Sequence, residues 1–230
     1  MFDPLYFLFL LPGMGLALWA QSRVSSAYAE GSRIPAASGL TGAQAAAEVL
    51  RAAGVEGVRI EPVAGELSDH YDPRGKVLRL SRGVYGSRSL AAIGIAAHEA
   101  GHAIQDNRHY HGLVLRNLIV PVAGIGSSVF WLFIVAGVLL QMLQLVLVGI
   151  ALFSLNVVFQ LVNLPVEYDA SRRARESLLS VGLIRPEEDA TVGHVLNAAA
   201  LTYVAATLTS VLSLLYYLYK FGVIGGGRDK

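Results

Sequence analysis

Three long runs without Asp, Glu, Lys or Arg constrain the fold of this chain more than any other feature. They cover residues 4–22, 117–166 and 190–219. A helix that crosses a bilayer needs about 20 predominantly apolar residues, so the first and last runs each hold one membrane span and the middle run holds two. The mean hydropathy of +0.52 agrees with this interpretation. The sequence therefore predicts a mainly α-helical membrane protein with about four transmembrane helices.

The middle run predicts a helical hairpin. It divides at residues 141–144 into spans near 118–140 and 143–164, with almost no connection between them. The outer ends of such a hairpin, at Arg116 and Glu167, lie on the same side of the membrane. The hairpin therefore returns Glu167 to the surface from which the chain entered the bilayer.

The first run is interpreted as an uncleaved membrane anchor. A signal peptide starts with basic residues and ends at a small-residue cleavage site. Residues 27–29, with the sequence AYA, could supply that site. However, the start of the chain carries Asp3 and no basic residue, whereas Arg23 follows the run. The pattern favours the anchor over the signal peptide.

Basic residues near the span ends predict the orientation, because they favour the cytoplasmic side. One side of the predicted spans collects Arg23, Arg33, Arg108, Arg116, Arg172, Arg173, Arg175 and Arg185. The other side collects Lys220, Arg228 and Lys230. The distribution favours an N-terminus outside the cell. It places the segments 21–116 and 165–192 in the cytoplasm.

The segment before the hairpin predicts a small α+β module. A helix is expected over 41–53, β-strands over 58–63 and 76–81, and an extended stretch over 67–72 that leads into a turn. A second helix is expected over 89–106, with Ser87 or Ser89 as its N-terminal cap. We interpret this module as zincin-like, because of the pattern that its last helix carries.

That last helix carries the sequence HEAGH at residues 98–102. His98 and His102 lie one turn apart on the same face, so both imidazoles can reach one ion at the zinc–nitrogen distance of about 2.0–2.1 Å. Glu99 flanks this face and can take a proton from water that the ion activates. The pattern predicts one catalytic Zn²⁺ ion with His98 and His102 as ligands and Glu99 as the general base.

Composition narrows the metal chemistry and the partners. The chain has no cysteine, so His, Asp or Glu must hold any metal ion. Glu99 is the one formal charge in the apolar stretch 90–105, and a neighbouring cation offsets the cost of burying it. The net charge of +1, without a basic patch, gives no reason to expect a nucleic-acid partner.

A catalytic zinc ion usually has three protein ligands, and the third must come from elsewhere in the chain. His109 and His111 follow the helix too closely to return to the site, which leaves His70, His194 and Glu167. The hairpin favours Glu167. A helix is predicted over 165–179. Pro165 either ends the preceding span or begins this helix. The helix also carries Asp169, which could orient a ligand imidazole.

Four stretches resemble a known family: HEAGHAIQ at 98–105, LPVEYDASRRA at 164–174, TGAQAAAEVL at 41–50 and LSDHYDPRGKVLRLS at 67–81. The chain resembles the neutral zinc metallopeptidases of bacterial membranes. More distantly, it is similar to the Ste24-type and HtpX-type proteases.

This resemblance implies a gluzincin-like zinc metalloendopeptidase with several membrane spans in the bacterial inner (plasma) membrane. His98, His102 and Glu167 would be the ligands and Glu99 the base. In the distant relatives the third ligand lies in a Glu-x-x-x-Asp pattern, but here Ser171 stands four residues after Glu167.

Together these features predict five regions and a mechanism. The regions are an anchor at 1–22, a cytoplasmic α+β module with the HExxH helix at 23–112, a transmembrane hairpin at 113–166, a cytoplasmic helix with the third ligand at 167–192, and a transmembrane helix with its tail at 193–230. The expected partners are the lipid bilayer and a polypeptide substrate, membrane-associated or cytoplasmic. The candidates for orienting a ligand or stabilising the oxyanion are Asp169, His70, Tyr168, Arg172 and His194.

The sequence leaves two other classes of function as alternatives to the peptidase. The first is a zinc-stapled membrane scaffold or partner protein without proteolytic activity, in which the metal only joins two helices. Such a site needs ligands but no base, so Glu99 is the residue that distinguishes it. The second is a transporter, which the absence of ionisable residues from spans 118–140 and 143–164 disfavours.

Overall fold

The computed structural model describes residues 4–225, so Arg228 and Lys230 of the orientation argument lie outside it. The chain divides into two compact units. The span unit comprises Met1–Trp19, Val114–Leu164 and Thr202–Lys230, and the mixed unit comprises Ala20–Leu113 and Pro165–Leu201. Each unit is described by itself.

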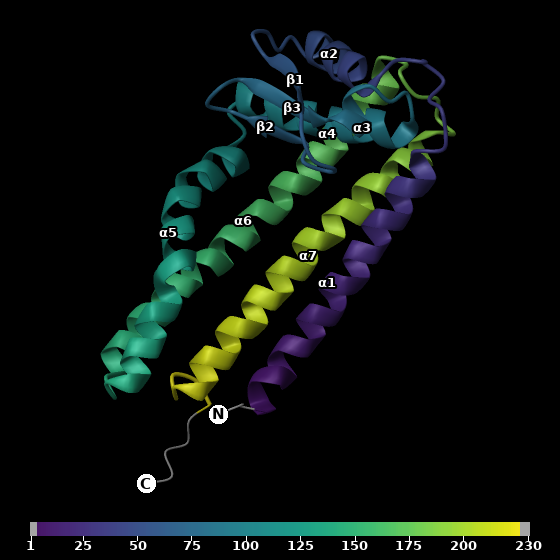
Figure 1. Cartoon of the computed structure of the whole chain (residues 1–230). Helices are drawn as coiled ribbons and strands as arrows, with labels where there is room; N and C mark the ends of the chain where they lie inside the picture. Colours follow the sequence, from purple (N-terminus) through teal and green to yellow (C-terminus); the bar gives the residue numbers. More distant parts are fainter. Residues whose placement is uncertain (1–3, 226–230) are drawn as a thin grey trace. The chain divides into compact units, whose positions relative to one another are not determined.

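Four helices in the described part of the chain are long and apolar enough to cross a membrane. They are α1 (Pro4–Gly31), α5 (His111–Leu139), α6 (Leu143–Ser180) and α7 (Asp189–Lys220) (Figure 1). Together with a small three-stranded sheet, they confirm the predicted mainly α-helical membrane protein with a small α+β module.

Within the span unit, α5 and α6 form the predicted tight hairpin (Figure 1). Glycine permits their close approach: a Cβ atom on Gly149 would lie 2.8 Å from the backbone oxygen of Phe130. Small residues let membrane helices pack closely in this way. A hydrogen bond of 3.2 Å from Asn156 Nδ2 to Ser210 Oγ joins α6 to α7.

The mixed unit contains the sheet and three further helices. Strands β1 (Arg59–Val63), β2 (His70–Asp72) and β3 (Val77–Ser81) pair in the order β1-β3-β2, with β1 parallel and β2 antiparallel to β3. The sheet therefore leaves β1 and β2 as its edges. The helices are α2 (Gly42–Ala52), α3 (Arg82–Tyr85) and α4 (Leu90–Asn107).

Local sequence explains where these helices begin. Thr41 and Gln44 form a capping box at the start of α2, each side chain bonding the backbone N–H of the other. Ser89 caps α4 by accepting a hydrogen bond from the backbone N–H of Ala92. Gly54 follows α2 with a φ of +69°, a conformation that favours glycine. The sequence predicted both helices and both long strands, whereas α3 was not predicted.

The core of the mixed unit lies around α4. Its buried residues, among them Leu78, Leu80, Ile93, Ala97 and Ile104, pack with one another and with apolar residues of α2, α6 and α7. Because α4 is buried on most sides, the histidine pattern sits on a helix whose position is fixed by packing.

One prediction about helix boundaries was wrong. Pro165 was expected to separate two helices, but α6 continues through Pro165 to Ser180 without a break. The following turns bury a stripe at every fourth residue, made of Val166, Ala170, Ala174 and Leu178, all 0% exposed. A proline inside a helix costs about 3 kcal/mol or more, and burial of this stripe offsets that cost.

Two other helices extend further than predicted. Helix α1 continues past the expected end of the first span at residue 22, because Ala27 is buried in a second apolar cluster with Ala91, Val195 and Ala198. Helix α5 begins at His111 rather than near 118. His109 ends the preceding turn with a φ of +50°.

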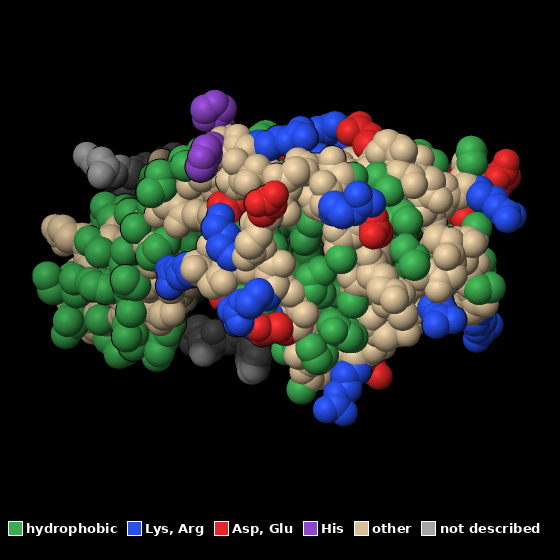
Figure 2. Space-filling view, turned by 90° about the horizontal axis from the view of Figure 1, so that it is seen from above, with side chains coloured by type: hydrophobic (Ala, Val, Ile, Leu, Met, Phe, Trp, Pro, Cys, Tyr) green, Lys and Arg blue, Asp and Glu red, His purple; other side chains and the backbone are tan. Residues whose placement is uncertain are grey.

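The surface of the molecule carries charges of both signs. In Figure 2, Lys and Arg side chains lie beside Asp and Glu side chains on the face that the view shows. Ion pairs on the surface include Arg59 with Glu61 and Lys76 with Asp106. Such pairs contribute little to stability individually.

Candidate metal centre

Two histidines of α4 and one glutamate of α6 converge in the mixed unit. Glu167 Oε2 lies 3.3 Å from His98 Nε2 and 3.4 Å from His102 Nε2. One ligand atom from each of the three residues lies within 4.8 Å of the others. Glu167 and His102 are buried, and His98 is half-buried. The structure thus brings together the three residues that the sequence singled out.

Glycine allows this convergence. A Cβ atom on Gly101 would lie 2.6 Å from the backbone oxygen of Ala170, closer than real Cβ contacts occur. Gly101 directly precedes His102, and Ala170 lies one turn after Glu167. The absence of a side chain at Gly101 therefore lets the two helices that carry the ligands touch. This contact explains why a glycine stands inside α4, although it destabilises a helix by about 1 kcal/mol relative to alanine.

The donor set and the two separations from Glu167 fit a zinc ion. Zinc accepts imidazole nitrogen and carboxylate oxygen, and bonds of about 2.0–2.2 Å at tetrahedral angles place neighbouring ligand atoms roughly 3.3–3.6 Å apart. Both separations from Glu167 Oε2, 3.3 and 3.4 Å, lie in this range. Three protein ligands also leave one position open, as catalytic zinc sites do.

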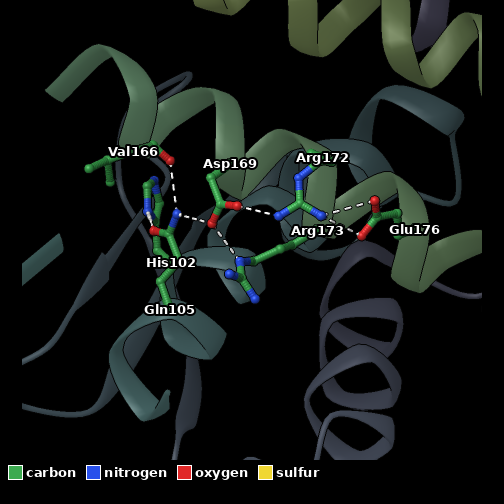
Figure 3. A network of polar contacts seen from close by, with 7 residues as sticks. All are labelled: His102, Gln105, Val166, Asp169, Arg172, Arg173 and Glu176. Carbon is green, nitrogen blue, oxygen red and sulfur yellow. Dashed lines mark hydrogen bonds and ion pairs between the residues drawn. The ribbon is translucent and has the colours of Figure 1, made fainter. Parts of the chain in front are cut away.

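The other ring nitrogens of the two histidines contact polar side chains. His98 Nδ1 lies 3.1 Å from Ser171 Oγ. His102 Nδ1 lies 3.0 Å from Gln105 Oε1, as Figure 3 shows. These contacts turn both Nε2 atoms toward Glu167. Partners of this kind orient metal-binding imidazoles and set their tautomers.

The sequence suggested that Asp169 contacts a ligand imidazole directly, but Gln105 lies between them. Its carboxylate accepts a hydrogen bond of 2.8 Å from Gln105 Nε2 and pairs with Arg172 and Arg173 (Figure 3). The partners of this carboxylate are Gln105 and the two arginines, so Asp169 reaches the imidazole of His102 only through Gln105.

Glu99 is buried beside the three ligands, with a relative exposure of 8%. Burial raises its pKa to about 7, and the negative charges of Glu167 and Asp69 act in the same direction, while His98 opposes them. A carboxyl group with a pKa near neutrality can accept and return a proton at physiological pH.

The remaining predicted residues surround the site less closely. His70 is exposed on the edge strand β2, and its Nδ1 lies 2.8 Å from the backbone oxygen of Ser68. Tyr168 and Arg172 line a cavity of about 330 Å³ that Ser171 also lines. His194 is half-buried in α7.

The sequence analysis did not predict that Gln105 contacts His102 or that Ser171 contacts His98. Spacing could have indicated both. Gln105 follows His102 by three residues, and Ser171 follows Glu167 by four, so each lies on the same helix face as a ligand. The hydroxyl of Ser171 contacts His98.

Comparison with known proteins agrees with this geometry. The family model described as "Putative neutral zinc metallopeptidase" matches residues 6–222. The chain belongs to this family of zinc metallopeptidases. It is also 47% identical over 225 residues to a Bacillus subtilis protein named "Putative membrane protease YugP", covering 97% of this chain and 99% of the relative. No solved structure matches the chain.

The description of the family indicates zinc as its metal and peptide hydrolysis as its class of reaction. Within the described residues, His98, His102 and Glu167 form the one group of His, Asp and Glu side chains with ligand atoms close enough to hold a metal ion. The four apolar helices and the name of the relative agree on a membrane protein.

Proposed function

We propose that this chain is a membrane-embedded zinc metalloendopeptidase of gluzincin type, with His98, His102 and Glu167 as ligands and Glu99 as general base. The observation that carries this proposal is the position of Glu167 Oε2, 3.3 and 3.4 Å from the two Nε2 atoms of the HExxH histidines. A carboxylate brought from another helix completes the ligand set that catalytic zinc requires.

Each residue has a distinct task in this proposal. Zinc, when bound, supplies a Lewis acid that polarises a peptide carbonyl and activates water for attack. His98 and His102 present their Nε2 lone pairs, and Glu167 adds one negative charge. Glu99 takes the proton of the attacking water on its carboxylate and passes it to the nitrogen of the leaving amine.

The apolar burial of Glu99 supports its role as base. A carboxylate in an apolar site is a stronger base than one in water, because burial disfavours its charged form. A structural zinc site would have no use for such a group. The peptidase therefore explains Glu99, whereas the zinc-stapled scaffold does not.

Substrate binding is proposed at the free edge of β2. An extended polypeptide can add to an exposed sheet edge through main-chain hydrogen bonds. Strand β2 is an edge strand and carries His70. We propose that His70 or Tyr168 stabilises the oxyanion that forms when water attacks the peptide carbonyl.

The proposed location is the inner membrane, with the site on the cytoplasmic side. The distribution of arginines around the predicted spans supports this orientation. In this proposal the regions 1–22, 113–166 and 193–230 lie in the membrane, and the regions 23–112 and 167–192 lie in the cytoplasm. The substrate is then a polypeptide that reaches the cytoplasmic surface.

Removal of the metal tests the proposal. Purified protein in detergent should cleave a fluorescence-quenched unstructured peptide, lose this activity after treatment with a chelator and regain it when Zn²⁺ is added back. Mg²⁺ should not restore activity, because it prefers an octahedral set of oxygen ligands. Cleavage that persists in protein shown to be free of zinc would contradict the proposal.

A further inference from the structure

Gln105 lies between the candidate ligand His102 and the carboxylate of Asp169. It is 0% exposed. Its Oε1 lies 3.0 Å from His102 Nδ1, and its Nε2 donates to Asp169 Oδ2 at 2.8 Å and to the backbone oxygen of Val166 at 2.9 Å (Figure 3). Both ends of the buried amide are therefore engaged.

The partners of Gln105 determine which way its amide points. A carboxylate and a backbone carbonyl only accept hydrogen bonds, so the NH₂ group must face Asp169 and Val166. The amide oxygen then faces His102. Because this oxygen cannot donate, Nδ1 of His102 must carry the proton, and the lone pair of the neutral ring is on Nε2. That atom is the one that faces Glu167.

Asp169 is held in place as an acceptor. Arg172 pairs with its Oδ1, and Arg173 pairs with its Oδ2. The chain of contacts thus runs from two guanidinium groups through one carboxylate and one amide to a single imidazole.

The second histidine lacks a directional partner of this kind. His98 Nδ1 contacts the hydroxyl of Ser171, which can donate or accept. The two histidines are therefore held differently. The orientation of His102 is fixed by a partner that accepts only, while that of His98 is compatible with either direction of the hydrogen bond.

We propose that Gln105 is a positioning residue that carries the acceptor character of Asp169 to His102 and so keeps His102 Nε2 in its metal-binding form. This inference rests on the proposed function, because it takes His102 to be a zinc ligand. It assigns Asp169 an effect on zinc that acts through Gln105 and not by direct contact with an imidazole.

Zinc affinity, measured by competition with a chromogenic chelator, tests this chain of contacts. Gln105→Met keeps the side-chain volume but removes all three hydrogen bonds of the amide, and should weaken zinc binding about 10–100-fold. Asp169→Ala should also weaken it. Because the two residues act in series, the double variant should bind zinc no more weakly than Gln105→Met alone.

Two further variants separate positioning from a general structural role. Asp169→Asn keeps an oxygen that can accept from Gln105, so it should retain most of the affinity that Asp169→Ala loses. If Asp169 acted only through its charge on the two arginines, the uncharged Asn would be about as damaging as Ala. Ser171→Ala acts on the other histidine, so its effect should multiply with that of Gln105→Met.

The outcomes that overturn the inference are distinct. Parent-like zinc affinity in folded Gln105→Met would overturn it, and so would multiplicative effects of Gln105→Met and Asp169→Ala. If Gln105→Met fails to fold, the comparison of Asp169→Asn with Asp169→Ala decides the question. His102→Ala is measured alongside, because unchanged zinc affinity in that variant would refute the ligand assignment, and with it the proposed function.

Discussion

Replacing Glu99 with glutamine is expected to reduce peptide cleavage by roughly 10²–10⁴-fold while zinc stays bound. Glutamine has nearly the same shape as glutamate, so the packing of α4 should be preserved. It cannot accept the proton that hydrolysis releases. The variant also relieves the cost of burying a carboxylate, which makes loss of folding an implausible cause of lost activity.

The measurement compares cleavage of a quenched peptide with zinc content in parent and Glu99→Gln protein. Glu48→Gln is a suitable control, because Glu48 is an acid of the same unit that pairs with Arg51 at the surface of α2. The control should cleave like the parent. Full activity in Glu99→Gln would remove the proposed base, and zinc binding without any cleavage by the parent would favour the scaffold.

The pH dependence of cleavage follows from the same residue. Burial raises the pKa of Glu99 to about 7 in the metal-free protein, and a nearby cation favours the ionised form. Only the ionised form can accept a proton, so the rate should fall as the pH drops through the pKa that Glu99 has beside zinc, which lies below its value of about 7 in the metal-free protein. This acidic decline should be absent from the residual activity of Glu99→Gln.

Replacing Glu167 with alanine is expected to lower zinc affinity by more than the roughly 10–100-fold that loss of an orienting partner costs. The variant removes one of three ligands and the one negative charge among them. Helix α6 should persist, because Val166, Ala170 and Leu178 remain buried around the substituted position. Cleavage should be lost together with the metal.

Glu176→Ala is the matched control for this variant. Glu176 lies on the same helix and pairs with Arg172, but it is exposed. Its removal should leave zinc content unchanged. Equal zinc affinity in Glu167→Ala and the parent, measured by the same competition with a chelator, would show that the third ligand lies elsewhere.

Much of the architecture followed from the sequence, because its signals are local. Charge-free runs located the four apolar helices, and the hairpin between 116 and 167 brought the third predicted ligand back to the HExxH helix. Capping residues located α2 and α4. The spacing of His98 and His102 needed only the pitch of a helix.

The remaining features depend on contacts between distant residues. Pro165 predicted a break, but the stripe from Val166 to Leu178 is buried by other elements, and its sequence alone does not reveal that burial. The part played by Gln105 was not predicted, because its partners belong to another helix. The reason for Gly101 became visible only with the backbone of Ala170 beside it.

The central claim is that two imidazoles and one carboxylate hold a single zinc ion. X-ray absorption at the zinc edge of the purified, loaded protein tests it most directly. The account predicts a first shell of nitrogen and oxygen at about 2.0–2.2 Å with two imidazoles, falling to one imidazole in His102→Ala. A spectrum without imidazole, or one that His102→Ala leaves unchanged, would contradict it.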